Sequence, residues 1–498
     1  MSRISNIRRL SGLGIFSLLV MLVLAACGDA TNTAAPPTTA ATSTTAAAAA
    51  TTAASVTTAA AATTAAGATT AAGATTAAAG ATTTAAGATT TAAGATAAAG
   101  ATAAASDTIT PNTSLSGTVR LSTATSSPEE DAIVKQQLQN FAKAYPNVKV
   151  NHEIIASDYD TKIKTSIAGN NAPDVFYVDS LIAPDYINGK VLEPLNSYAD
   201  KNKVSLSDFY PTLSKAFTGA DNNVYGLPKD HNTLVMFYNK DMFQKAGITA
   251  VPTTTEELKA ALTKLKGVLP ADVAPLAADP DLARVLPWVY AFGGSMLSAD
   301  NKASAVNSPG FKAGLDFYYG LRQAGLSKKS SELGADWAGD ALIKEKAAVA
   351  FEGGWLIPPL NKTPTKDKVG IAPLPKATTQ ATLDFTVAYV MSSKSANKDA
   401  AFALLSFLTS TSQQRLLSDI GLALPSRQAL TEGFVQKYPE RKALVDSTNF
   451  AKPWQFGVGF GGFADKVNPE LQSLFSGSKP QDQVIKNIDD LVKQTLSQ

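Results

Sequence analysis

From residue 115 to the C-terminus, the pattern of apolar and polar positions predicts short strands that alternate with amphipathic helices. The expected order is strand 117–121, helix 128–144, strand 148–155, helix 159–168 and strand 174–179. Such alternation is typical of an α/β fold with a largely parallel, doubly wound sheet. Ligands of such sheets bind beyond the carboxyl ends of the strands, so we expect the loop 122–126 and the end of strand 174–179 to border a ligand cleft.

A continuous apolar run at 234–238 predicts a buried strand in the middle of the chain. Gly226 and Pro228 precede it and are typical of a turn, and a short helix is expected from Asn239 to Gly247. Because the run is apolar on both faces, we expect this strand to be covered on both sides, as in an α/β sheet.

The same pattern continues downstream. Segment 252–258 predicts a helix start, with Thr caps and Glu near the positive end of the helix dipole. Segment 347–355 predicts a buried strand that runs into a Gly pair and a Trp. A further strand is expected at 385–391, followed by an amphipathic helix at 397–408.

The first 27 residues have the features of a secretory leader. Three arginines precede an apolar run at 15–24, which is too short to span a membrane as a helix. The sequence Leu24-Ala25-Ala26-Cys27 resembles a bacterial lipobox, in which the Cys thiol is lipidated and becomes the mature N-terminus. Cys27 is the only cysteine, so neither a disulfide framework nor a thiolate metal cluster is expected. A lone cysteine could also be a nucleophile, but its place directly after the apolar run favours lipidation.

Residues 28–114 are predicted to form a disordered tether. From Ala30 to Ser106 there is no charged or aromatic residue, and glycines recur at near-heptad spacing among Ala and Thr. This composition offers no apolar stripe for a core or a partner helix. A flexible coil of this length spans roughly 50 Å, enough to carry a folded domain through a cell-wall layer. The threonines either carry O-glycans or form an inert spacer, and the composition favours the spacer.

The remaining segment, 115–498, is too long for one ordinary domain and suits two lobes. The formal net charge of the chain is +2 and acidic and basic residues are interleaved, so no nucleic-acid surface is indicated. The two histidines, His152 and His231, lie far apart without zinc-site spacing, and we expect no metal and no cofactor. The Gly-rich run 457–462 is predicted to be a loop, because it does not lie between a strand and a helix of a βαβ unit.

Several motifs resemble those of the extracellular solute-binding proteins of ABC importers, in particular the group typified by maltose-binding protein. They are Gly226-Leu-Pro228 followed by the strand that closes on Tyr238-Asn-Lys-Asp241, segments 172–178 and 191–195, and the strand that ends at Trp355. The resemblance covers nearly all of 115–498. It implies a type II two-lobe fold, in which each lobe is a sheet flanked by helices and a multi-strand hinge joins the lobes. The implied first lobe is 115–229 with 377–430, and the second is 230–376 with 431–498.

The resemblance also implies a ligand cleft between the lobes. A pyranose ring has an apolar C–H face, which flat aromatic rings bury, and a rim of hydroxyls, which polar side chains bind. Three of the four tryptophans follow Pro or Gly turns, although a core position is equally common for Trp; Trp337 is expected in the core. The expected ligand-binding residues are Ser122, Thr123, Asp179, Asn232, Trp288, Trp355, Arg427 and Trp454.

The resulting prediction is a monomeric, lipid-anchored receptor on the outer face of the cytoplasmic membrane. It would capture a mono- or oligosaccharide and deliver it to the permease subunits of an ABC importer. Two alternatives remain open. A lipid-anchored glycoside hydrolase needs two carboxylates at a fixed separation, and no motif nominates such a pair. A ferric-ion receptor of the same fold would use paired tyrosines, but the helical spacing around Tyr318 and Tyr319 favours core packing.

Overall fold

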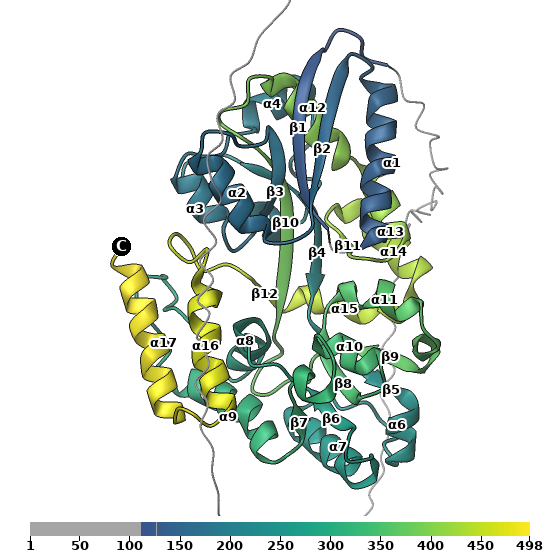
Figure 1. The fold of residues 1–498 in the computed structure, drawn as a ribbon, viewed down its shortest axis with the longest axis vertical. Coiled ribbons are helices and arrows are strands. Elements are labelled where there is room, and N and C mark those ends of the chain that lie inside the picture. The colour runs from purple at the N-terminus through teal and green to yellow at the C-terminus, as the bar shows by residue number, and fades with distance from the viewer. Residues whose placement is uncertain (1–110, 126) are drawn as a thin grey trace, which may run out of the picture. The chain divides into compact units, whose positions relative to one another are not determined.

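Two β-sheets, each covered by helices, make up the part of the chain that the computed structural model describes, residues 111–125 and 127–498. Figure 1 shows the first sheet and its helices in the upper part of the view and the second sheet in the lower part. We call these two layered units the first lobe and the second lobe. The predicted leader and nearly all of the predicted tether lie outside the described residues.

The first sheet is mixed rather than largely parallel. Its strand order is β11-β4-β10-β3-β1-β2, with β12 paired to β10. The strands β1, β2 and β3 are parallel, as the sequence predicts, whereas β10 is antiparallel to both β3 and β4. This strand runs the opposite way because it enters the first sheet from the second lobe. The bounds are β1 (Gly117–Ala124), β2 (Val148–Ile155), β3 (Val175–Asp179), β4 (Gly226–Thr233), β10 (Thr382–Met391), β11 (Leu424–Pro425) and β12 (Ala451–Pro453).

Helices cover both faces of the first sheet, since neighbouring residues of a strand point to opposite sides. Tyr177 of β3 shares a core with Phe141 of α1 (Pro128–Ala144) and Phe402 of α12 (Lys398–Leu408). Phe176 shares the opposite core with Ile163 of α2 (Tyr159–Ala168). The predicted bounds of α1 and α2 are confirmed. The other helices of this lobe are α3 (Ala183–Asn188), α4 (Asn196–Asn202), α5 (Pro211–Ala216) and α13 (Thr411–Asp419).

The central strand of the second sheet is β8 (Ala347–Glu352), which is buried along its whole length. The strand order is β7-β6-β8-β5-β9, with β5 (Val235–Asn239), β6 (Ala274–Ala277), β7 (Ser327–Lys328) and β9 (Val369–Ala372). Met236 of β5 belongs to the core on one face of this sheet and Phe237 to the core on the other. The predicted burial of this apolar run on both faces is therefore confirmed.

Two helices of the second lobe, α6 and α7, begin at the capping signals predicted from the sequence. The side chain of Asn239 accepts the backbone N–H of Met242 at the start of α6 (Lys240–Lys245). Thr254 and Glu257 form a capping box at the start of α7 (Thr255–Val268). The remaining helices are α8 (Leu282–Ala291), α9 (Pro309–Gln323), α10 (Ala338–Ile343), α11 (Ile357–Asn361), α14 (Thr431–Lys437), α15 (Lys442–Asp446), α16 (Phe463–Phe475) and α17 (Gln481–Leu496). Short 3-10 helices are η1 (Ser330–Leu333), η2 (Gly354–Leu356), η3 (Pro364–Lys368), η4 (Gln428–Leu430), η5 (Pro439–Arg441) and η6 (Ser447–Asn449).

The strands β4, β10 and β12 carry the chain between the two sheets. The chain leaves the first sheet after Thr233 and enters the second at Val235, so only Leu234 lies between the two strands. It returns through β10, whose first residue, Thr382, donates its hydroxyl to the carbonyl oxygen of Leu234 at 2.7 Å. The third passage is β12, which pairs with the start of β10. Crossings this short confine any rotation of the lobes to a few residues.

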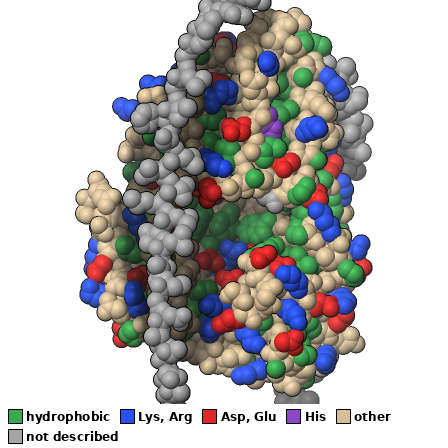
Figure 2. All heavy atoms as spheres, viewed as in Figure 1, with side chains coloured by type: hydrophobic (Ala, Val, Ile, Leu, Met, Phe, Trp, Pro, Cys, Tyr) green, Lys and Arg blue, Asp and Glu red, His purple; other side chains and the backbone are tan. Residues whose placement is uncertain are grey.

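Acidic and basic side chains are interspersed over the face of the molecule shown in Figure 2. The near balance of charge, +2 for the whole chain, agrees with this pattern. This face therefore lacks the basic stripe by which nucleic-acid-binding proteins are recognised. Within the described residues, none of the helices combines the length and the apolar composition needed to cross a membrane.

Candidate ligand-binding site

A cavity of about 210 Å³ lies where the strands cross between the lobes. A hollow of about 390 Å³ beside α7 is larger, but it belongs to the second lobe alone and has no aromatic lining. Ligand sites combine apolar and aromatic walls with a few polar groups, and the cavity at the crossings has both. Its lining comes from both lobes and consists of Ala124, Thr125, Glu130, Tyr177, Lys229, Asp230, Asn232, Trp355, Phe385, Val387, Leu422 and Ala423.

Two aromatic rings form one wall of this cavity, and a third ring packs behind them. Trp355 and Phe385 line it, with ring centroids 5.7 Å apart and the rings nearly perpendicular. Trp454 contacts Phe385 at 5.6 Å between centroids and is itself 7 % exposed. Edge-to-face aromatic pairs stabilise one another by about 0.5–1.5 kcal/mol beyond the area they bury. The apolar face of a ligand can therefore stack on a wall whose rings support each other.

The polar side of the cavity is built around Lys229. Its Nζ lies 2.7 Å from Oε1 of Glu130, contacts Oδ2 of Asp230, and lies 5.2 Å from the centroid of the Tyr177 ring. Burial disfavours the ammonium charge, but the carboxylates of Asp230 and Glu130 outweigh burial and raise the pKa of Lys229. Burial also raises the pKa of Asp230, and Lys229 counteracts that rise. The cavity thus contains a lysine whose charge is already balanced by two carboxylates.

Asn232 joins the crossing strand β4 to the turn that carries Trp355. Its Oδ1 accepts the backbone N–H of Gly354 at 3.1 Å. A Cβ at position 354 would come within 2.5 Å of this same oxygen, so glycine permits the close approach. The amide of Asn232 therefore fixes the position of the Trp355 turn relative to the first lobe.

Ser122 and Thr123 lie in the first sheet rather than in a loop. The pairing of β1 with β2 continues to Ala124, three residues beyond the predicted end of the strand. Ser122 donates to Oε2 of Glu153 at 3.4 Å, and the Thr123 hydroxyl lies 2.8 Å from Nε2 of His152. The residues of this segment that reach the cavity are the next two, Ala124 and Thr125.

Asp179 ends β3 and is half-buried. Its Oδ1 accepts the backbone N–H of Leu181 at 2.8 Å, and burial raises the pKa of its carboxyl to about 7. Asp179 is not among the residues that line the cavity. Its contact with a ligand remains a prediction.

The structure places Trp288 in the core of the second lobe. The side chain is 1 % exposed, and its ring centroid lies 4.8 Å from that of Phe317 and 5.0 Å from that of Phe351. A fully buried position in mid-helix α8 explains why this tryptophan does not reach the cavity. The neighbouring Pro287, which suggested a turn, lies inside the helix.

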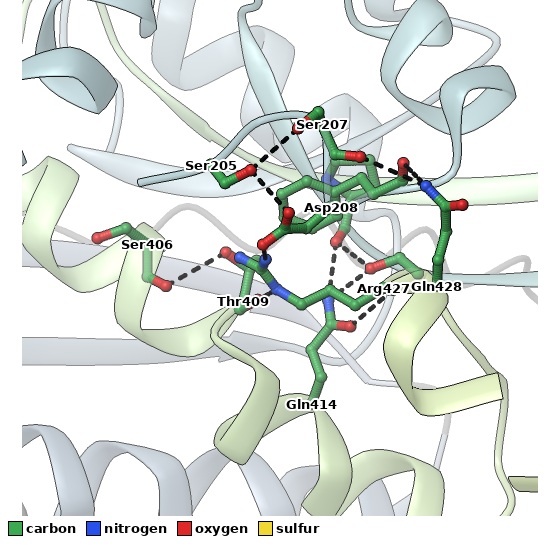
Figure 3. A network of polar contacts seen from close by, with 11 residues as sticks. Ser205, Ser207, Asp208, Ser406, Thr409, Gln414, Arg427 and Gln428 are labelled. Atoms are coloured by element: carbon green, nitrogen blue, oxygen red, sulfur yellow. Dashed lines mark hydrogen bonds and ion pairs between the residues drawn. The ribbon is translucent and has the colours of Figure 1, made fainter. Parts of the chain in front are cut away.

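Arg427 belongs to a polar network of the first lobe (Figure 3). Its Nε donates to the carbonyl oxygen of Thr409 at 2.5 Å, and its Nη1 lies 3.3 Å from Oδ2 of Asp208. Its guanidinium carbon also lies 4.2 Å from the centroid of the Phe209 ring. The Arg427 side chain is almost fully buried and does not line the cavity. Its contacts instead fix the segment after β11 against the rest of the first lobe.

Of the predicted ligand residues, Asn232 and Trp355 line the cavity, whereas Trp454 does not line it and packs against Phe385. Sequence reasoning missed Glu130, Lys229 and Phe385. Glu130 lies in the first turn of α1, where the helix dipole alone favours an acid. The available signal for this cluster was Lys229, which directly follows Pro228 and precedes a buried strand. A lysine that is buried with such a strand needs a charged partner nearby.

A ligand cavity between two α/β lobes that are joined by three short crossings defines a two-lobe solute-binding receptor. Residues 124–415 match the family described as bacterial extracellular solute-binding protein. The chain belongs to this family.

Individual relatives agree with this assignment. A protein of Brucella abortus (strain 2308), named as a binding protein, is 24% identical over 385 residues, which cover 75% of this chain and 92% of that protein. The ABC substrate-binding protein of Listeria monocytogenes in complex with cycloalternan has a TM-score of 0.70 at 24% identity, over 77% of this chain and 99% of that one. UgpB from Mycobacterium tuberculosis in complex with glycerophosphocholine has a TM-score of 0.69 at 19% identity, with the same coverage. The fold is thus that of the type II binding proteins, and the chain is a bacterial extracellular solute-binding protein.

Proposed function

We propose that the protein is a lipid-anchored receptor that captures a small, uncharged carbohydrate in the cavity at the lobe crossings and delivers it to the permease of an ABC importer. The observation that carries this proposal is the pairing of an aromatic wall, Trp355 and Phe385, with a lysine whose charge is already offset by two carboxylates. A pyranose needs both features, since its C–H face is apolar and its rim is made of hydroxyls.

The charge balance favours a sugar over a phosphate ester. Among the described residues that line the cavity, Lys229 is the only Lys or Arg, and it contacts two carboxylates. A phosphate would have to approach those carboxylates without a cation of its own, which the desolvated site disfavours. Neutral hydroxyls can instead donate to Glu130 and Asp230 and leave the lysine paired.

The volume of the cavity favours a short ligand. About 210 Å³ lies below the roughly 300–1,000 Å³ that is typical of sites for drug-sized molecules. With the lobes at this separation, one or two sugar rings are a better fit than a long oligosaccharide.

The contacts of the residues concerned argue against each of the two alternative functions, the glycoside hydrolase and the ferric-ion receptor. Glu130 and Asp230 both contact the ammonium of Lys229, whereas a glycosidase pair must flank the bond that it cleaves. The ferric-ion alternative uses Tyr318, which is fully buried and donates its hydroxyl to the carbonyl oxygen of Asp279 at 3.0 Å.

A screen of ligands by thermal shift tests the proposed function. Maltose, trehalose, xylobiose and glucose would be compared with glycerophosphocholine, and a ligand at a hundredfold excess over its Kd should stabilise the protein by about 2.7 kcal/mol. We expect a sugar to raise Tm and to be recovered unchanged by chromatography. Stabilisation by glycerophosphocholine alone, or release of monosaccharide from the disaccharides, would contradict the proposal.

The lipid anchor is proposed from Leu24-Ala25-Ala26-Cys27 and the tether that follows, which lie outside the described residues. We expect Cys27→Ala to abolish lipidation and to leave the protein unprocessed or outside the membrane fraction. A normally processed Cys27→Ala variant that still needs detergent for its release would contradict the anchor.

A further inference from the structure

Glu352 ends the central strand of the second sheet, three residues before Trp355. Its strand, β8, pairs with β5 on one side and with β6 on the other, so the backbone of Glu352 belongs to a rigid part of the lobe. The side chain is only 1 % exposed. A carboxylate buried to this degree requires partners, because an unpaired buried charge is strongly disfavoured.

Two donors converge on one oxygen of this carboxylate. The indole Nε1–H of Trp355 donates to Oε2 at 2.8 Å, and Nη2 of Arg284 donates to the same oxygen at 2.5 Å. The guanidinium carbon of Arg284 also lies 5.8 Å from the centroid of the Trp355 ring. Burial raises the pKa of Glu352, and the Arg284 guanidinium counteracts that rise. The arginine thus favours the carboxylate form of the acceptor that faces the indole.

Gly353 provides the space in which the indole lies. A Cβ at this position would overlap the six-membered ring of Trp355. The ring therefore lies back against the main chain of its own turn, and Phe385 of β10 in the first sheet packs against it at 5.7 Å between centroids. A change of rotamer would break both the packing and the hydrogen bond to Glu352.

We propose that Glu352 is a positioning residue that holds the indole of Trp355 in its ligand-binding orientation before a ligand arrives, with Arg284 holding Glu352. The consequence for affinity rests on the proposed function, in which a sugar stacks on this ring. A tryptophan that is already ordered loses little rotamer freedom on binding. Without Glu352 the ligand must order the ring, which weakens affinity by roughly three- to tenfold.

The ligand-free protein tests the positioning directly. In protein labelled with ¹⁵N-tryptophan, the indole N–H resonance of Trp355 is assigned by its disappearance in Trp355→Phe. We expect this N–H to exchange slowly with solvent in the wild type and in Glu352→Gln, which keeps an acceptor oxygen. In Glu352→Ala the resonance should shift and exchange quickly. If the alanine variant does not fold, Arg284→Gln is the second variant and should move the same resonance.

Asp281→Asn is the matched control. Oδ1 of Asp281 lies 3.8 Å from Nη1 of Arg284, so this variant removes a charge beside the same arginine without removing a partner of the indole. An asparagine also keeps the oxygen that caps α8. We expect the Trp355 resonance to be unchanged in this variant. An unchanged resonance and exchange rate in Glu352→Ala would overturn the proposal.

A titration with the same four sugars distinguishes the positioning role of Glu352 from the proposed function of sugar binding. For a sugar that binds, Glu352→Ala should weaken affinity in the wild-type background and add nothing in Trp355→Phe, because Phe has no N–H to position. A further loss of affinity in Trp355→Phe would show that Glu352 acts by another route. If none of these sugars binds the wild type while the indole resonance depends on Glu352, the proposed function fails and the positioning role stands.

Discussion

The Nζ of Lys362 lies 2.6 Å from Oε1 of Glu129, so an ion pair joins the end of α11 in the second lobe to the first turn of α1 in the first lobe. The hydrogen bond from Lys362 is the main reason why the pKa of Glu129 is lowered. The next residue, Glu130, lines the cavity, so the pair lies at the edge of the ligand site. It can form only while the lobes are close together.

Reversal of one charge in this pair should oppose closure of the lobes. We expect Lys362→Glu to weaken ligand binding by about two- to fivefold, the size of an exposed ion pair, with a smaller effect at high salt. The double variant Lys362→Glu with Glu129→Lys should recover affinity in titration calorimetry. Lys366 is exposed and forms no ion pair with the residues that the structure describes, so Lys366→Glu is the control variant with the same change of charge. Equal losses in Lys362→Glu and Lys366→Glu would contradict a specific pair.

Trp355 and Trp288 should behave in opposite ways when each is replaced by alanine. Trp355 lines the cavity and is half-buried, so Trp355→Ala should weaken binding by more than about 1.4 kcal/mol, a factor of ten, with little change in the stability of the ligand-free protein. Trp288 is a core residue, so Trp288→Ala should lower the free energy of unfolding by about 3–5 kcal/mol. Urea unfolding and fluorescence titration measure the two effects. A binding defect in a stable Trp288→Ala protein would refute this distinction.

Asp179 should make stability depend on pH. Burial raises its pKa from 3.8 to about 7, so the folded protein keeps a proton that the unfolded chain releases. As the pH rises from about 4 to about 7, this carboxyl therefore lowers the free energy of unfolding. Asp179→Asn keeps the acceptor for the Leu181 N–H but does not titrate. We expect the variant to match the wild type near pH 4 and to exceed it above about pH 7; a difference that does not vary with pH would show that Asp179 titrates normally.

The Gly-rich loop 457–462 is fixed by a carboxylate of the first lobe. The backbone N–H groups of Gly459 and Gly461 both donate to Asp185 of α3, the second at 3.0 Å. A Cβ at Gly461 would overlap Oδ2 of Asp185, whereas a Cβ at Gly462 meets nothing within 4 Å. We expect Gly461→Ala to lower the free energy of unfolding by roughly 1–3 kcal/mol and Gly462→Ala to have little effect. Equal thermal stability of the two variants would mean that this contact contributes little.

Local signals in the sequence were sufficient for most individual elements. The bounds of α1, β2 and α2 agree with the prediction because each rests on short-range causes: a proline and acids in the first helical turn, alternation, and spacing of apolar residues. The end of β1 was missed by three residues, because its length is set by pairing with β2. Strand pairing is a long-range interaction that no local window contains.

The sequence by itself determined the class of the protein: its α/β elements, the motifs of a two-lobe solute receptor, and a Trp after the Gly353–Gly354 turn. It did not decide which polar and aromatic residues meet. Trp288 and Trp355 both follow residues typical of turns, yet one is enclosed by α8 and its core and the other faces the cavity. Likewise, Glu130 and Lys229 are 99 residues apart in the sequence. They become partners only when α1 packs against the sheet that contains β4. Tertiary structure decided these contacts, because burial and distance depend on how all the elements pack, whereas helix caps and apolar spacing depend only on neighbours in the chain.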